Sequence, residues 1–258
     1  RSRPSPEIRR WSLASVFGIG PTDYETPTPS GVPFAVLLPA CDADVTSLEG
    51  LRQYDRGLDP TDATDRAQVL YVGANHNFFN REWRFDDNDA LRRACTSAQQ
   101  VGGAAQRGML EIVLSDWLRA TALAEPLPAY LRAEAETPAL VDFWADADLD
   151  LRWSYAGPDR FVIDDFEGTG APDVNDLGGD DYTGMIAAIT CTGTCARNFS
   201  HRVGAVRPAW RDAPALMSFA IGDVDASGWG VLSMRFASRI ATINDGIVEH
   251  DLGIRVRD

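Results

Sequence analysis

The chain has 258 residues, of which 45% are hydrophobic and 24% charged, and its formal net charge is −14. This composition is typical of a globular protein, and the length allows two cores of roughly 100–150 residues each. The negative charge argues against nucleic acid and anionic membrane surfaces as partners, because both would repel the chain. No apolar stretch approaches the roughly 20 residues of a membrane-spanning helix, so no membrane span is expected.

The first part of the chain alternates short apolar runs with helical patterns, which favours βα units on a parallel sheet. The apolar runs predict strands over residues 11–19, 32–39 and 68–73. Residues 1–122 are therefore expected to form an α/β domain.

Two capping-box patterns predict where helices begin in this domain. Thr46-Ser-Leu-Glu49 predicts a helix to about Arg56, and Thr96-Ser-Ala-Gln99 predicts one to about Thr121. Apolar residues lie nearly all round the second helix, so it is expected to be buried against the sheet.

Residues 123–150 are rich in Ala, Glu, Asp and Pro and are expected to link this domain to a second one. Further along, apolar and polar residues alternate with a period of two, as in Leu232, Met234 and Phe236, and turn signals such as Gly178-Gly179 separate the runs. Residues 151–258 are therefore expected to form an all-β sandwich or jelly roll.

The four cysteines point to an oxidising, exported location. Cys191 and Cys195 enclose only small residues, which allows a tight disulfide loop, and no second ligand pair lies nearby for a metal. Cys41 and Cys95 remain as a candidate second bridge.

Polar residues follow two of the predicted strands. The strand ending at Pro39 leads to Asp42 and Asp44, and the strand ending at Gly73 leads to His76. Functional groups gather at the carboxyl ends of parallel strands, so a carboxylate and an imidazole are expected side by side. Such a pair activates a hydroxyl nucleophile. The alternatives are that His76 is a packed or surface residue, and that the aspartates serve as a helix cap and a turn carboxylate.

The order of these segments resembles the last strands of α/β-hydrolases. Asp42-Ala-Asp-Val45 is similar to an Asp-x-x-Val acid loop of that family, and Gly73-Ala-Asn-His76-Asn-Phe-Phe-Asn80 resembles the histidine loop of cutinase-like and polyester-hydrolysing members. The resemblance covers about residues 8–122. It implies that His76 is the general base and Asp42 its acid, with Asp44 as the competing assignment. Phe78, Phe79 and Trp83 are candidates for lining a substrate pocket or for filling the core beneath the loop.

No Gly-x-Ser-x-Gly nucleophile motif occurs in these residues. The resemblance therefore implies that the nucleophile lies on an upstream segment of the same protein, and that these 258 residues alone are inactive.

The second domain resembles galactose-binding-like and carbohydrate-binding jelly rolls. By that resemblance, Asp165, Glu167 and Asp258 are candidate ligands for a structural Ca²⁺, although a solvated acidic loop is the commoner meaning of such a run. Trp210 and Trp229 are candidate platforms for sugar stacking or residues that pack the core. No cofactor is expected to be required.

The sequence thus predicts part of a secreted serine hydrolase, esterase- or lipase-like, that cleaves small-molecule or polymeric carboxylic esters. The alternative is a non-catalytic carbohydrate-binding protein in which a decayed hydrolase half supports the β-domain.

Overall fold

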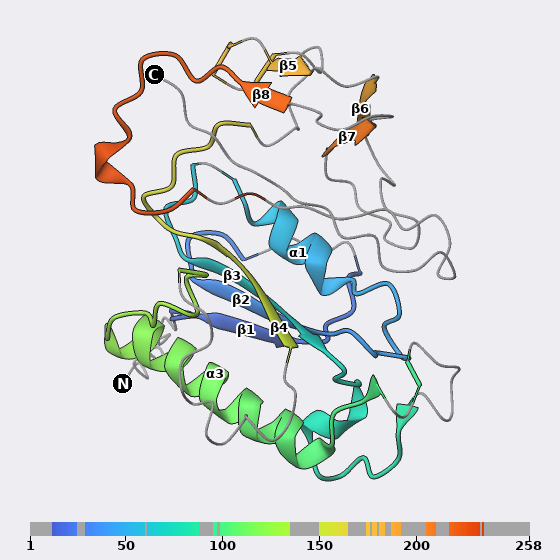
Figure 1. Cartoon of the computed structure of the whole chain (residues 1–258). Coiled ribbons are helices and arrows are strands. Elements are labelled where there is room, and N and C mark those ends of the chain that lie inside the picture. The colour runs from blue at the N-terminus through green and yellow to red at the C-terminus, as the bar shows by residue number, and fades with distance from the viewer. Residues whose placement is uncertain are drawn as a thin grey trace, which may run out of the picture.

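The computed structural model describes residues 12–24, 29–59, 61–87, 95–96, 99–134, 150–164, 174–175, 177–179, 181–183, 187–191, 205–209, 217–232 and 234. A four-stranded sheet in the order β1-β2-β3-β4 lies at the centre of the first part of the chain (Figure 1). Its strands are β1 (Val16–Ile19), β2 (Phe34–Pro39), β3 (Arg66–Val72) and β4 (Asp150–Ala156). The first three run parallel to one another, as predicted, and β4 runs antiparallel to β3.

Two helices cover opposite faces of this sheet, α1 (Gly50–Arg56) and α3 (Gly103–Leu123) (Figure 1). Strand β2 is buried along its whole length because alternate side chains meet different helices. Phe34, Val36 and Leu38 form a cluster with Tyr54 of α1. Leu37 belongs to a second cluster, which includes Met109 and Val113 of α3. The sheet therefore forms the middle of three layers.

Helix α1 begins three residues later than the capping-box pattern predicts, with Glu49 in place of Thr46 at the N-cap. No side chain caps its first turn. The two carboxylate oxygens of Glu49 accept hydrogen bonds elsewhere, from Ser47 Oγ and from the backbone amide of Asp23. The box is therefore absent because its glutamate ties the start of α1 to the loop after β1.

Helix α3 also begins later than predicted. Gln99 does reach back to Thr96, accepting from its amide at 3.0 Å and its hydroxyl at 2.9 Å. The helix itself begins only at Gly103, with Gly102 as its N-cap residue.

The second helix packs on the sheet as predicted, but the apolar residues that lie nearly all round it are not all buried. Gln106, Met109, Val113 and Trp117 are buried, whereas Leu118 is 44% exposed. The buried positions follow one another at intervals of three or four residues, so a single face of α3 packs on the sheet.

Strand β4 lies across the boundary at residues 150/151 where the second domain was expected to begin. Its Leu151, Trp153 and Tyr155 pair with Tyr71, Val69 and Ala67 of β3. Leu151 and Trp153 pack against the same cluster as α3. The alternating pattern of β4 thus belongs to the edge of the first sheet, and the sheet extends beyond residue 122.

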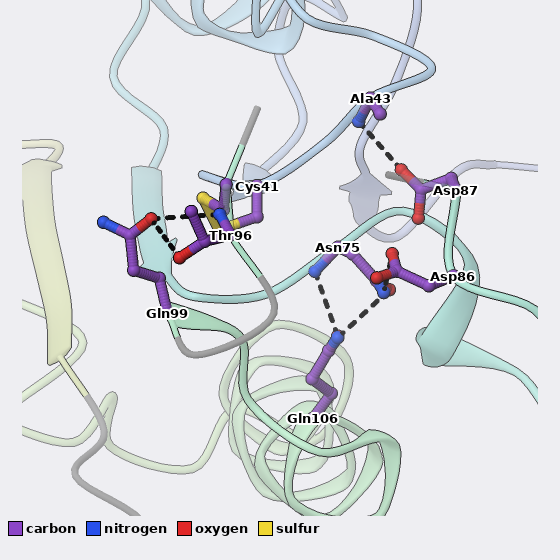
Figure 2. Close-up of a disulfide and its surroundings, with 9 residues drawn as sticks. Cys41, Ala43, Asn75, Asp86, Asp87, Thr96, Gln99 and Gln106 are labelled. Atoms are coloured by element: carbon purple, nitrogen blue, oxygen red, sulfur yellow. Dashed lines mark hydrogen bonds between the residues drawn. A yellow bond between two sulfur atoms is a disulfide. The ribbon is translucent and has the colours of Figure 1, made fainter. Parts of the chain in front are cut away.

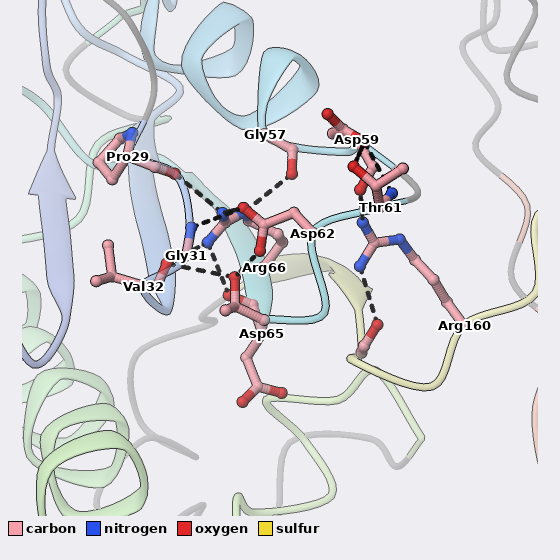
Figure 3. A network of polar contacts seen from close by, with 12 residues as sticks. Pro29, Gly31, Val32, Gly57, Asp59, Thr61, Asp62, Asp65, Arg66 and Arg160 are labelled. Carbon is pink, nitrogen blue, oxygen red and sulfur yellow. Dashed lines mark hydrogen bonds and ion pairs between the residues drawn. The ribbon is translucent and has the colours of Figure 1, made fainter.

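A buried guanidinium fixes the start of β3 (Figure 3). Arg66 is fully buried and donates to the carbonyls of Pro29 (2.9 Å) and Gly57 (2.9 Å), to that of Val32, and to Asp62 Oδ2 (2.6 Å). One side chain therefore joins the segment before β2, the end of α1 and the turn before β3.

The later strands form two antiparallel pairs. Strand β5 (Asp181–Thr183) pairs with β8 (Met217–Phe219), and β6 (Ala187–Cys191) pairs with β7 (Ala205–Ala209). The turn expected at Gly178-Gly179 is present. Gly178 has φ +77°, the carbonyl of Asn175 accepts from the Gly178 amide, and Asn175 Oδ1 accepts from the Gly179 amide. A short 3-10 helix, η4 (Ala226–Gly228), follows β8. The sandwich or jelly-roll arrangement itself remains a prediction.

In the described part of the chain, no helix combines the length and apolarity needed to cross a membrane.

Candidate active site

The carboxyl ends of β2 and β3 hold Asp42 and His76 next to each other. Backbone bonds join the two chain segments beyond the strands, from the Ala40 amide to the Tyr71 carbonyl (3.0 Å) and from the Cys41 amide to the Ala74 carbonyl (2.8 Å). Asp42 Oδ2 lies 2.9 Å from His76 Nδ1. The predicted contact between acid and imidazole is therefore present.

Asp42 is held firmly within its own loop. Its side chain is buried, and Oδ1 accepts from the backbone amides of Asp44 (2.9 Å) and Val45 (2.6 Å). With Oδ1 bound to the backbone, Oδ2 is left to orient the imidazole. A buried carboxylate bonded in this way is a suitable partner for fixing an imidazole tautomer.

Asp44 occupies a different place. Its side chain is 59% exposed, and Oδ2 lies 3.8 Å from Nε2, the other nitrogen of the His76 ring. It therefore stands on the side of the ring that would exchange a proton with a nucleophile. Of the two candidate acids, Asp42 has the geometry of the orienting residue.

The pKa of the His76 imidazole is raised above its ordinary value of 6.5. The hydrogen bond to Asp42 is the largest cause, and the charges of Asp42, Asp44 and Asp87 add to it. Partial burial of the ring acts in the opposite direction. The surroundings therefore stabilise the imidazolium, which is the form a general base takes after accepting a proton.

Gly20, directly after β1, packs against both members of the pair. Its φ is +50°, in the left-handed region, and a Cβ there would lie 3.2 Å from both Asp42 Oδ2 and His76 Nδ1. The amide of Gly20 donates to the Leu37 carbonyl at 2.8 Å. Both the backbone conformation and the close approach favour glycine.

Aromatic residues after His76 divide into packed and exposed ones. Phe79, in the 3-10 helix η1 (Asn77–Phe79), packs against the buried core and lies 6.4 Å from Tyr71 between ring centres. Trp83 is 48% exposed, and its ring stacks on that of His76, with centres 5.8 Å apart and an interplanar angle of 19°. Asn80 Oδ1 accepts from the amide of Trp83 at 2.9 Å and so helps to fix this turn.

A buried amide pair supports the histidine loop from α3 (Figure 2). Gln106 Oε1 accepts from the Asn75 amide at 3.2 Å, and its Nε2 donates to Asn75 Oδ1 at 3.3 Å. Asn75 Nδ2 in turn donates to Asp86 Oδ1 at 2.9 Å. The residue that precedes His76 is therefore fixed on both sides.

The disulfide Cys41–Cys95 is present, as the sequence predicts (Figure 2). It fastens the residue immediately before Asp42 to a segment 54 residues further along the chain. Cys195, the expected partner of Cys191, lies outside the described residues.

Other candidates also lie outside the described residues: Asp165, Glu167, Asp258 and Trp210. The structure therefore does not address the expected calcium site. The described part of the chain contains no group of three or more His, Cys, Asp or Glu side chains able to hold a metal ion. Trp229 is half-exposed. Its ring is tilted by 36° against that of Phe161, with ring centres 5.1 Å apart, and its Nε1 donates to the Asp159 carbonyl.

Comparisons with protein-family models, curated proteins and solved structures found no match for this chain. The site is therefore interpreted from its own geometry. Sequence reasoning located Asp42 and His76 but overlooked Gly20 and Asp87. A glycine after an apolar strand, followed by proline, is read simply as a turn, and nothing in the sequence near Asp87 links it to the strand ends.

Proposed function

We propose that Asp42 and His76 are the orienting acid and the general base of a hydrolase that cleaves carboxylic esters through an acyl-enzyme intermediate. The observation that supports this most strongly is the 2.9 Å contact between the Asp42 carboxylate and Nδ1 of the half-buried His76 imidazole. This carboxylate is buried and also accepts hydrogen bonds from two backbone amides. The Asp42 contact leaves Nε2 as the nitrogen that can accept a proton.

In this proposal a serine hydroxyl attacks the carbonyl carbon of the ester, and its proton passes to Nε2 of His76. The resulting imidazolium, stabilised by Asp42, gives this proton to the leaving alcohol as the C–O bond breaks. Water then repeats the sequence on the acyl-enzyme and releases the acid. The serine would come from a segment upstream of residue 1, as the resemblance to α/β-hydrolases implies. On the same basis, β1 to β3 with α1 and α3 would be the end of an α/β-hydrolase sheet.

The electrostatic surroundings favour a neutral substrate. Asp44 lies 3.8 Å from Nε2, and the whole chain carries a net charge of −14. An anionic ester would be repelled on approach, whereas developing positive charge on the imidazole would be stabilised. Neutral small or polymeric esters are therefore the proposed substrates, and the disulfide next to Asp42 fits an exported enzyme.

The test uses the protein together with its upstream segment and short-chain p-nitrophenyl esters. His76→Ala should remove nearly all hydrolysis, and Asp42→Asn should lower kcat by about 10⁴-fold, because the amide no longer selects the right tautomer. Asp44→Asn should lower kcat by less than about tenfold, because the Asp44 side chain is exposed. Asp150→Asn, at an exposed ion pair, serves as the control.

Two outcomes would count against the proposal. One is hydrolysis that survives in His76→Ala. The other is an equal loss in Asp44→Asn and Asp42→Asn, which would show that orientation of the ring is not what matters.

A carbohydrate-binding protein without hydrolase activity is the competing reading, and the half-exposed Trp229 is the described residue that favours it. Sugar binding that is lost in Trp229→Ala, with no ester hydrolysis in the wild-type protein joined to its upstream segment, would support it.

A further inference from the structure

The geometry points to Asp87 as a positioning residue that holds the Asp42 loop and the His76 loop together through their backbones. This inference rests on the proposed function for its catalytic meaning. The placement of Asp87 itself stands on contacts that do not depend on that function.

Asp87 makes the same kind of bond to both loops. Its Oδ2 accepts from the amide of Ala43 at 2.8 Å, and its Oδ1 accepts from the amide of Asn77 at 3.3 Å. Ala43 follows Asp42 directly, and Asn77 follows His76 directly. One carboxylate therefore joins the two chain segments one residue beyond each member of the pair; Figure 2 shows its bond to Ala43.

The burial of Asp87 makes these bonds important. Its relative exposure is 1%, so water does not replace a lost partner at either amide. A carboxylate can accept at both oxygens, whereas the side chain of Asn offers one acceptor and one NH₂ group. Asn at position 87 would therefore turn a donor toward one of the two amides and release that loop.

The charge of Asp87 acts on the same ring. It is one of three carboxylates, with Asp42 and Asp44, that favour the protonated form of His76. Removal of this charge, together with loosening of the loops, should lower the affinity of His76 for its proton. Asp87 thus affects the pair through both geometry and charge, without hydrogen bonding to the imidazole.

The test compares Asp87→Asn with Asp62→Asn in the full chain. Asp62 is a matched control because its side chain is also largely buried and also accepts from a backbone amide, that of Gly31 at 3.0 Å. Asp62 lies before β3 and His76 lies after it, so the two residues are at opposite ends of this strand. Amide exchange and the titration of the His76 ring are followed by NMR, and kcat and KM are measured where hydrolysis is found.

In Asp87→Asn, exchange at Ala43 and Asn77 should accelerate at least about tenfold, the titration of His76 should move to lower pH, and kcat should fall by about 10- to 100-fold with KM little changed. Asp62→Asn, which removes the ion-pair partner of Arg66 before β3, should leave the titration of His76 unchanged. Asp87→Glu, which keeps the charge and both acceptors, should behave more like the wild-type protein than Asp87→Asn does.

Unchanged exchange and titration in a folded Asp87→Asn would overturn the inference. If Asp87→Asn does not fold, the wild-type protein still decides: rapid exchange at Ala43 and Asn77 would overturn the inference, and strong protection would support it. Absence of hydrolysis in the wild-type protein joined to its upstream segment would contradict the proposed function and leave the NMR comparison valid.

Discussion

The indole of Trp83 lies against the imidazole of His76, with ring centres 5.8 Å apart and planes inclined by 19°. The Trp83 indole is a fluorophore that lies on one face of the His76 imidazole. Protonation of His76 is therefore expected to change the emission of Trp83. A cation held over an indole face is also favoured electrostatically.

The fluorescence of the protein is therefore expected to titrate with His76. The pKa of this ring is raised above 6.5, chiefly by its hydrogen bond to Asp42. The midpoint of the change should thus lie above pH 6.5, with quenched emission on the acid side, and the base-dependent limb of kcat/KM should share that midpoint. Trp83→Phe should abolish the fluorescence change. A midpoint at or below 6.5 in the wild-type protein would contradict the assigned environment.

The raised pKa of His76 also predicts how the stability of the fold depends on pH. The pKa of His76 is higher in the folded state than in the unfolded chain, so the folded state binds this proton more tightly. The stabilisation is fully present below about pH 6.5, the unfolded value, and is lost as pH rises through the folded pKa. Replacement by Gln should therefore reduce the free energy of unfolding more at pH 6 than at pH 9, as measured by urea denaturation. A larger loss at pH 9 would reverse the sign and refute the linkage.

Gly20 and Gly31 form a matched pair for testing how closely the backbone approaches the site. Both have a positive φ, +50° and +70°, but a Cβ at Gly31 meets nothing within 4 Å. Each change to Ala should cost about 1 kcal/mol of stability for the left-handed conformation. Only Gly20→Ala should also disturb the titration of His76 and any hydrolysis. Equal effects of the two variants on His76 would show that the contact at Gly20 is unimportant.

Among the charged residues of the sheet, Arg66 should be the one whose replacement lowers the free energy of unfolding most. It is fully buried and bonded to Asp62 and to loop carbonyls, so its removal takes a hydrogen bond from each of these acceptors. Arg66→Ala is expected to lower the free energy of unfolding by about 3–5 kcal/mol. Arg152→Ala, which breaks an exposed ion pair with Asp150, should change it by less than about 1 kcal/mol. Similar midpoints in urea for the two variants would contradict this ranking.

The elements predicted well from the sequence are those with local signals. The β2 run Phe-Ala-Val-Leu-Leu-Pro is buried on both faces, and such strands appear as continuous apolar runs. Asp42 and His76 were found because polar residues after two neighbouring parallel strands must lie at the same edge of a sheet.

The features that were missed depend on contacts between distant parts of the chain. Glu49 looks like half of a capping box until the structure shows it bonded to the amide of Asp23. Strand β4 has the alternation of any half-buried strand, and nothing local indicates that Leu151 pairs with Tyr71. Asp87 contacts Ala43 across 44 residues of sequence, so its role is invisible without coordinates.

The protonation of the His76 ring nitrogens is the most direct measurement, because the base function requires Asp42 to hold one tautomer. NMR of the chain with ¹⁵N-labelled histidine, recorded across the titration, identifies the nitrogen that carries the proton in the neutral ring. The expected result is a proton on Nδ1, an unprotonated Nε2 and a pKa above 6.5. A neutral ring with its proton on Nε2, or a titration unaffected by Asp42→Asn, would contradict the assignment of His76 as a base oriented by Asp42.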